Sequence, residues 1–63
     1  MKKAFYDSHT RINKDGSRRK PALIYIIKDN GDGTSMVDFH SSCEQRNVKN
    51  KWIKAYNPST RWE

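Results

Sequence analysis

The 63-residue chain lacks the motifs that identify an enzyme, a metal protein or a disulfide-bonded domain. Its single cysteine, Cys43, cannot form an intramolecular disulfide. The two histidines, His9 and His40, are accompanied by no Ser/His/Asp order, and together with Cys43 they match no standard zinc spacing. We therefore expect a non-enzymatic protein without cofactor or metal, in which Cys43 is an inert, partly buried residue at the start of a helix.

Long apolar segments are also missing. No apolar run of about 7–15 residues follows Met1-Lys2-Lys3, so no secretory signal is expected, and nothing approaches the roughly 20 apolar residues of a membrane span. A reducing cytoplasm is the expected location, with no membrane partner. One domain over residues 1–63, with residues 57–63 as a short tail, would bury only about 60% of the surface of its unfolded chain. Aromatic side chains must then supply much of the core, and a homodimer is an alternative source of stability.

Acidic residues are few compared with basic ones, and the net charge is +6. The charge is uneven along the chain: residues 2–20 carry +5, residues 21–42 carry −2 and residues 43–63 carry +3. A basic protein is attracted to polyanions, and such a distribution can place a basic face opposite an acidic turn. Charge of this size also serves solubility alone, so the partner is open between nucleic acid and an acidic protein surface.

The pattern in the first two thirds of the chain predicts a β-hairpin. Residues 22–28 predict a strand whose apolar run over residues 22–27 suits cover on both faces, and residues 35–40 alternate with Val37 and Phe39 on one side. The Asn-Gly and Asp-Gly pairs between them favour a hairpin turn, which gives an antiparallel hairpin over residues 22–40. A further strand is expected within residues 3–12, followed by a basic loop over residues 17–21.

The last third predicts an α-helix over about residues 43–56. Ser41 with Glu44, or Ser42 with Gln45, has the spacing of a capping box. At 100° per residue an apolar stripe lies on one side, with Ile53 outside it, and Asn57-Pro58 ends the helix. The predicted fold is therefore α+β, a small antiparallel sheet of two to three strands with one C-terminal helix packed on one face. Its expected core consists of Phe5 or Tyr6, Leu23 or Ile24, Ile26, Val37, Phe39, Val48, Trp52 and Tyr56.

These elements suggest non-enzymatic binding of DNA or RNA through phosphate contacts. A basic loop would clamp the backbone and one face of the helix would follow it. The candidate nucleic-acid-binding residues are Arg11, Lys14, Arg18, Arg19, Lys20, Arg46, Lys49 and Lys54. In topology alone, three strands followed by a helix are similar to the arm-type DNA-binding domains of tyrosine recombinases and to AP2-like plant domains, which implies a sheet in the major groove.

The alternative is a small accessory or phage-type inhibitor that binds a host protein and acts by covering its surface. The apolar strand leaves one side for a partner or a second copy, and exposed rings make good interface anchors. Tyr25 and Trp62 are the candidate partner-binding residues. Tyr25 is either part of the core or, if exposed among cations, a platform on which bases stack.

Overall fold

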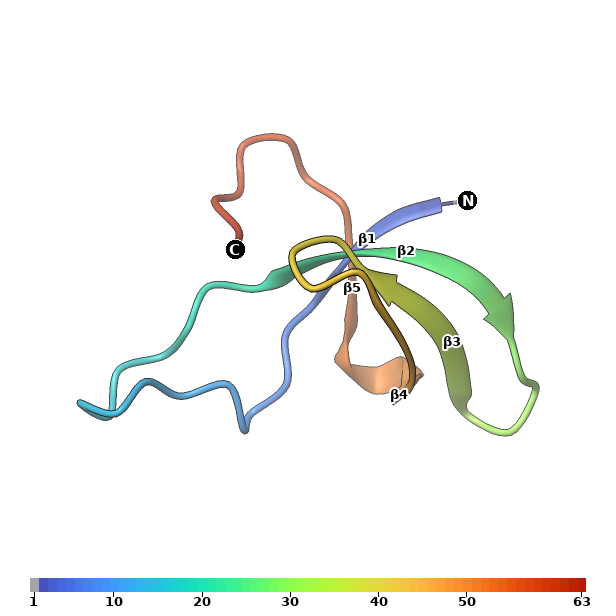
Figure 1. Ribbon diagram of the computed structural model, residues 1–63, viewed down its shortest axis with the longest axis horizontal. Coiled ribbons are helices and arrows are strands. Elements are labelled where there is room, and N and C mark those ends of the chain that lie inside the picture. Colours follow the sequence, from blue (N-terminus) through green and yellow to red (C-terminus); the bar gives the residue numbers. More distant parts are fainter. Residues whose placement is uncertain (1) are drawn as a thin grey trace.

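This computed structural model describes residues 2–63, which contain five antiparallel strands and one 3-10 turn joined by loops (Figure 1). The strands follow one another in the sheet in the order β4-β3-β2-β1-β5. The elements are β1 Lys2–Tyr6, β2 Ala22–Asp29, β3 Thr34–Phe39, β4 Glu44–Lys49, the 3-10 turn η1 Asn50–Trp52 and β5 Ile53–Ala55.

The hairpin predicted over residues 22–40 is confirmed, because β2 and β3 pair antiparallel. The turn between them contains two glycines in the left-handed region, Gly31 at φ 80° and Gly33 at φ 91°. Asn30 closes this turn by donating its backbone N–H to the Thr34 carbonyl at 3.0 Å. Positive φ is a conformation that glycine adopts without steric cost, so the local sequence determined this element.

The α-helix predicted over residues 43–56 is wrong, and with it the α+β fold class. This segment forms β4, η1 and β5, so the protein is all-β. Ile53, which does not fit the helical stripe, pairs with Tyr6 across the β5–β1 ladder. Pairing with β4 satisfies the N–H and C=O groups along the free edge of β3, which a helix over residues 43–56 would have left unpaired. This gain outweighs a local helical pattern. The topological similarity to three-strand-plus-helix DNA-binding domains does not survive this correction.

The serines predicted to cap the helix lie instead in a tight turn between β3 and β4. Cys43 stands at its end with φ 55° and donates its N–H to the Phe39 carbonyl at 2.8 Å. Its thiol is exposed, not partly buried at a helix start as predicted. A four-residue β-hairpin loop often needs a left-handed residue in this place, and that need determines the conformation of Cys43.

The strand predicted within residues 3–12 is confined to β1, and residues 7–21 form a long loop. The loop folds back on itself through an isolated antiparallel bridge between Ile12 and Arg18, and Asn13 donates its N–H to the Ser17 carbonyl at 2.8 Å. Figure 1 shows this loop at one end of the long axis and the β2–β3 turn, with Asp29 and Asp32, at the other. The basic loop and the acidic turn thus lie apart, as the uneven charge suggested.

The core lies on one side of the sheet, here called the inner face. Register places Ile24 opposite Ala4 and Phe39, and Val37 opposite Ile26. The cluster consists of Ala4, Ala22, Ile24, Val37, Phe39 and Val48, with Tyr6, Ile26 and Ile53 packed against it. Two predicted core residues are misplaced, because Trp52 is only half-buried and Tyr56 is exposed. Both belong to the apolar stripe of the predicted helix, which does not form.

The C-terminal residues 56–63 fold back over the opposite, outer face. Tyr56 packs its ring 5.3 Å from that of Phe5, and Trp62 lies 5.4 Å from the His40 ring. Glu63 donates its N–H to the Pro21 carbonyl at 2.9 Å and accepts from Leu23 N–H at 3.5 Å. Phe5 and Leu23 are buried as a result, which accounts for the uninterrupted apolar sequence of β2.

Candidate nucleic-acid interface

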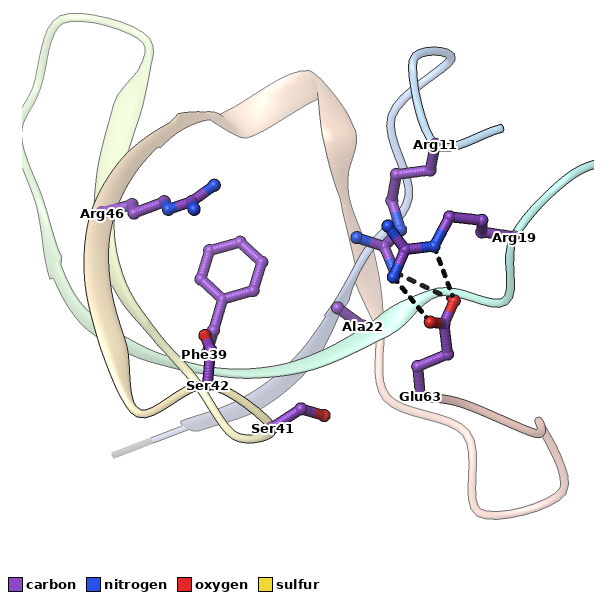
Figure 2. Close-up of a pocket in the computed structure, with 8 residues that line it drawn as sticks. All are labelled: Arg11, Arg19, Ala22, Phe39, Ser41, Ser42, Arg46 and Glu63. Atoms are coloured by element: carbon purple, nitrogen blue, oxygen red, sulfur yellow. Dashed lines mark hydrogen bonds and ion pairs between the residues drawn. The ribbon is translucent and has the colours of Figure 1, made fainter. Parts of the chain in front are cut away.

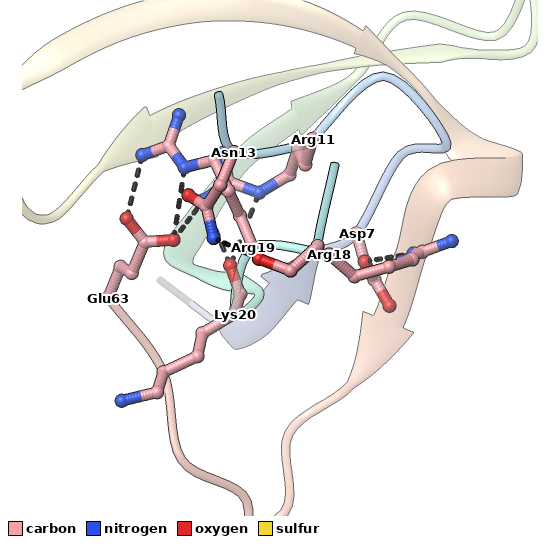
Figure 3. Close-up of polar contacts among 8 residues, drawn as sticks. Asp7, Arg11, Asn13, Arg18, Arg19, Lys20 and Glu63 are labelled. Carbon is pink, nitrogen blue, oxygen red and sulfur yellow. Dashed lines mark hydrogen bonds and ion pairs between the residues drawn. The ribbon is translucent and has the colours of Figure 1, made fainter. Parts of the chain in front are cut away.

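The arginines of the long loop are engaged with carboxylates (Figure 3). Arg18 forms an ion pair with Asp7 at 2.7 Å, and Arg19 forms one with Glu63 at 2.7 Å. The two pairs lie on opposite sides of the loop. Lys20 lies near enough to Glu63 for its charge to add to the effect of Arg19 and Arg11 in lowering the pKa of that carboxyl. Within residues 2–63, no ion pair involves Lys14 or Lys20. The predicted clamp of three neighbouring cations is therefore split between two sites.

Arg11 and Arg19 share the Glu63 carboxylate. Arg19 binds both carboxylate oxygens, with Nη2 at 2.7 Å and Nε at 3.2 Å, and Arg11 Nη2 lies 3.3 Å from one of them. This hydrogen bonding raises the pKa of Arg19 and lowers the pKa of Glu63. The two arginines come from opposite sides of the folded loop, where Arg19 N–H donates to the Arg11 carbonyl at 3.0 Å.

Two cavities that share lining residues lie side by side over the inner face of the sheet, and together we call them the inner groove. The first, about 260 Å³, is lined by Arg11, Arg19, Ala22, Phe39, Ser41, Ser42, Arg46 and Glu63 (Figure 2). The second, about 370 Å³, is lined by Tyr6, Ser8, His9, Thr10, Phe39, Arg46, Asn47, Val48, Lys49 and Trp52. Phe39 and Arg46 line both, so they form the boundary between the two cavities.

Arg46 occupies the centre of the groove because of its register in β4. It pairs with Val37 across the β3–β4 ladder, which directs its side chain to the inner face. Its guanidinium lies 5.4 Å from the Phe39 ring centroid and donates to Glu44 from Nε at 3.0 Å and Nη2 at 2.7 Å. Figure 2 shows it pointing into the first cavity from the side opposite Arg11 and Arg19. Sequence reasoning selected Arg46, but on a helix face instead of a strand.

Aromatic rings line the second cavity. Tyr6 meets Phe39 edge-on at 5.5 Å, and His9 lies 4.8 Å from the Trp52 ring. Tyr6 and Trp52 are half-buried and His9 is exposed, so parts of these rings face the groove. Sequence reasoning missed all three as groove residues. The available signal was the number of rings. The sequence has seven Phe, Tyr and Trp side chains, and only Phe5 and Phe39 are buried.

The other predicted residues are not brought into the groove, except Lys49, which lines its second cavity. Lys54 pairs with Phe5 in the β5–β1 ladder and so belongs to the outer face. Lys14 lies in the turn of the long loop. The two alternative partner-binding residues, Tyr25 and Trp62, flank His40 at 6.0 and 5.4 Å on the outer face. Tyr25 is half-buried and Trp62 is 38% exposed.

Other kinds of site receive no support from the described residues. Within residues 2–63, no three His, Cys, Asp or Glu side chains are grouped so that they could hold a metal ion. No helix in that range has the length and apolar character needed to cross a membrane. Comparisons with protein-family models, with curated proteins and with solved structures find no match for this chain. A function must therefore be inferred from the chemistry of the groove.

Proposed function

We propose that the protein binds single-stranded nucleic acid in the inner groove without catalysing a reaction. The observation that carries this proposal is Arg46, whose guanidinium covers Phe39 and lines both cavities. Proteins that bind single strands combine a basic groove, which follows the phosphates, with rings on which bases stack. An arginine plane serves both purposes, since it pairs with phosphate and stacks on bases.

The groove has this combination along its length. Arg11 and Arg19 stand at one end, Arg46 in the middle and Lys49 at the other end. The Tyr6, His9 and Trp52 rings lie on the side of Lys49. Bases in a duplex are stacked on one another and cannot use such rings, whereas the splayed bases of a single strand can. This supports single-stranded nucleic acid, in preference to a duplex, as the ligand of the groove.

The test is a fluorescence-anisotropy titration of labelled single-stranded DNA, single-stranded RNA and duplex DNA at several salt concentrations. We expect Arg46→Ala to weaken binding of the single strand by about 5- to 150-fold, which corresponds to the roughly 1–3 kcal/mol of a lost stacking contact. The slope of log affinity against log salt should flatten by about 0.7 for the lost phosphate contact. Arg46→Lys should restore the slope but not the stacking.

Lys54→Ala is the matched control, because it removes one positive charge from the outer face. If it weakens binding as much as Arg46→Ala, the attraction is diffuse and the groove is not the site. If no oligonucleotide binds more tightly than about 100 μM at low salt, nucleic-acid binding is excluded.

The alternative would then be an inhibitor or adaptor that binds a protein through the outer face, where Tyr25 and Trp62 flank His40. Such binding would saturate with one protein and persist at about 0.5 M salt, because contacts between buried apolar groups are not screened.

A further inference from the structure

We propose that Arg11 and Arg19 form a phosphate-binding subsite at one end of the inner groove, and that the Glu63 carboxylate occupies this subsite as an internal competitor. The inference rests on the proposed function for the identity of the ligand, a phosphate of the nucleic-acid backbone. It goes further in naming a specific site for that phosphate and a residue of the chain that limits access to it.

The two arginines present the geometry that an oxyanion needs. Arg19 contacts both oxygens of Glu63 through Nη2 and Nε, and Arg11 approaches one of the same oxygens. This two-pronged arrangement suits a phosphate as well as a carboxylate, because both present paired oxygens to the planar guanidinium. Glu63 therefore marks the position in which a phosphate oxygen would be bound.

Arg11 is held in place independently of Glu63. Its Nε and Nη2 donate to the Lys20 carbonyl at 3.3 and 3.0 Å, and its side chain is only 12% exposed. A guanidinium fixed in this way loses little side-chain freedom when it binds an anion. Its remaining donors stay directed at the subsite if the carboxylate leaves.

Glu63 is held less firmly by its surroundings than Arg11. Its side chain is 36% exposed, and among the described side chains its carboxylate forms hydrogen bonds and ion pairs with the two arginines, while the charge of Lys20 acts on it without an ion pair. The Arg19–Glu63 pair joins side chains that are 44% and 36% exposed, and a pair of this exposure contributes little net stability, so an incoming phosphate can displace the carboxylate from Arg19. The lowered pKa of Glu63 means that the carboxylate stays charged, and so competes with phosphate, at neutral pH.

The subsite is continuous with the rest of the groove. Arg46, Arg11 and Arg19 line the same 260 Å³ cavity, and Figure 2 shows their guanidinium groups directed into it from opposite sides. The hydroxyl-bearing residues Ser41 and Ser42 lie on its wall. A strand bound over Arg46 would thus extend towards Arg11 and Arg19, where its next phosphate meets Glu63.

The first test compares Glu63→Gln with the wild type in the oligonucleotide titration. We expect a 3- to 10-fold gain in affinity and a salt slope steeper by about 0.7, the value for one additional phosphate contact on a single strand. Asp38→Asn is the matched control, since it removes the same charge at a half-buried position on β3. In an Arg19→Ala background the gain from Glu63→Gln should disappear.

The second test uses inorganic phosphate as the probe and does not depend on nucleic-acid binding. The Nε–H signals of Arg11 and Arg19 are followed by ¹⁵N–¹H NMR while phosphate is added to the wild type and to Glu63→Gln. Phosphate should shift both signals at lower concentration in Glu63→Gln, and circular dichroism should show an unchanged sheet.

The outcomes separate the two proposals. If oligonucleotides bind and depend on Arg46, but Glu63→Gln gains no more than Asp38→Asn, the subsite is refuted while the proposed function stands. If phosphate shifts the two arginine signals but no oligonucleotide binds, the subsite stands and nucleic acid is not its ligand. If phosphate shifts neither signal in either protein, the subsite is refuted whatever the oligonucleotides do.

Discussion

Replacement of Ile24 by alanine tests whether the core belongs to the sheet. Ile24 is 0% exposed and lies between Ala4 and Phe39 in the two neighbouring strands. Removing its methyl and methylene groups from such a position costs about 2–5 kcal/mol. A domain of this size has a stability of about 3–9 kcal/mol at the usual value per residue, so Ile24→Ala should remove a large part of it.

Two companion variants make the test specific. Ile27→Ala makes the same chemical change in the same strand at a residue that is 40% exposed, and we expect it to cost less than about 1 kcal/mol. Trp52→Ala removes a half-buried ring that contacts His9 and Lys51, and about 1–2 kcal/mol is expected. A helix over residues 43–56 would instead place Trp52 in the core and make this the most damaging change.

Urea denaturation followed by far-ultraviolet circular dichroism measures all three variants, because the signal does not depend on a tryptophan that one variant lacks. With a urea dependence of about 1 kcal/mol per M, Ile24→Ala should lower the midpoint by about 2 M or more. If Trp52→Ala lowers the midpoint as much as Ile24→Ala does, the sheet-centred core is refuted.

Two further predictions concern backbone strain and pH. Cys43→Gly should stabilise the protein by up to about 1 kcal/mol, because a residue with a side chain is disfavoured at φ 55° and glycine is not. The measurement is the thermal midpoint, which should rise. Cys43→Ala, which keeps the Cβ atom, should give no such rise. Hydrogen bonds from Ser17 and Thr34 lower the pKa values of Asp15 and Asp32, and Arg19 lowers that of Glu63. The ionised carboxylates therefore contribute their full stabilisation when the pH is above the ordinary pKa values, 3.8 for Asp and 4.5 for Glu. This stabilisation should be lost as the pH falls through the lowered pKa values of the folded protein. A urea midpoint that stays constant or rises between pH 5 and pH 2 would contradict this, and Glu63→Gln should show a smaller fall than the wild type.

The sequence predicted the elements whose conformation is determined locally. Residues 22–40 carry their own strand alternation and a turn with two glycines at positive φ, so the β2–β3 hairpin follows from short-range chemistry. Residues 44–55 carry no comparable signal, and only Val48 among them is buried. Their conformation depends on two partners that a local pattern does not reveal. β4 pairs with the edge of β3, which exists only once the β2–β3 hairpin has formed, and β5 pairs with β1, whose Tyr6 is distant in sequence. A helical periodicity in this stretch was therefore weak evidence.

The same distinction between local and distant contacts explains what could be predicted of the candidate site. Composition indicated cations and rings, and four of the eight predicted residues, Arg11, Arg19, Arg46 and Lys49, do line the inner groove. The residues that meet there are determined by strand register and by the packing of residues 56–63 against the sheet. Arg46, for example, faces Arg11 and Arg19 only when β4 pairs with β3. The contribution of Tyr6, His9 and Trp52 likewise requires β1 and η1 to be side by side, which Asp7 ensures by donating its N–H to the Trp52 carbonyl at 2.9 Å.

Arginine and lysine have different roles in this surface. All four arginines among the predicted residues form ion pairs, with Asp7, Glu44 or Glu63, whereas within residues 2–63 the four predicted lysines form none. The arginines are thus oriented, and the planes of three of them are directed at one cavity. Under the proposed function the lysines would contribute mainly a diffuse attraction that salt screens. Under the proposed function the net charge of +6 would attract polyanions in general, and selectivity for a single strand would come from the oriented arginines and the rings beside them.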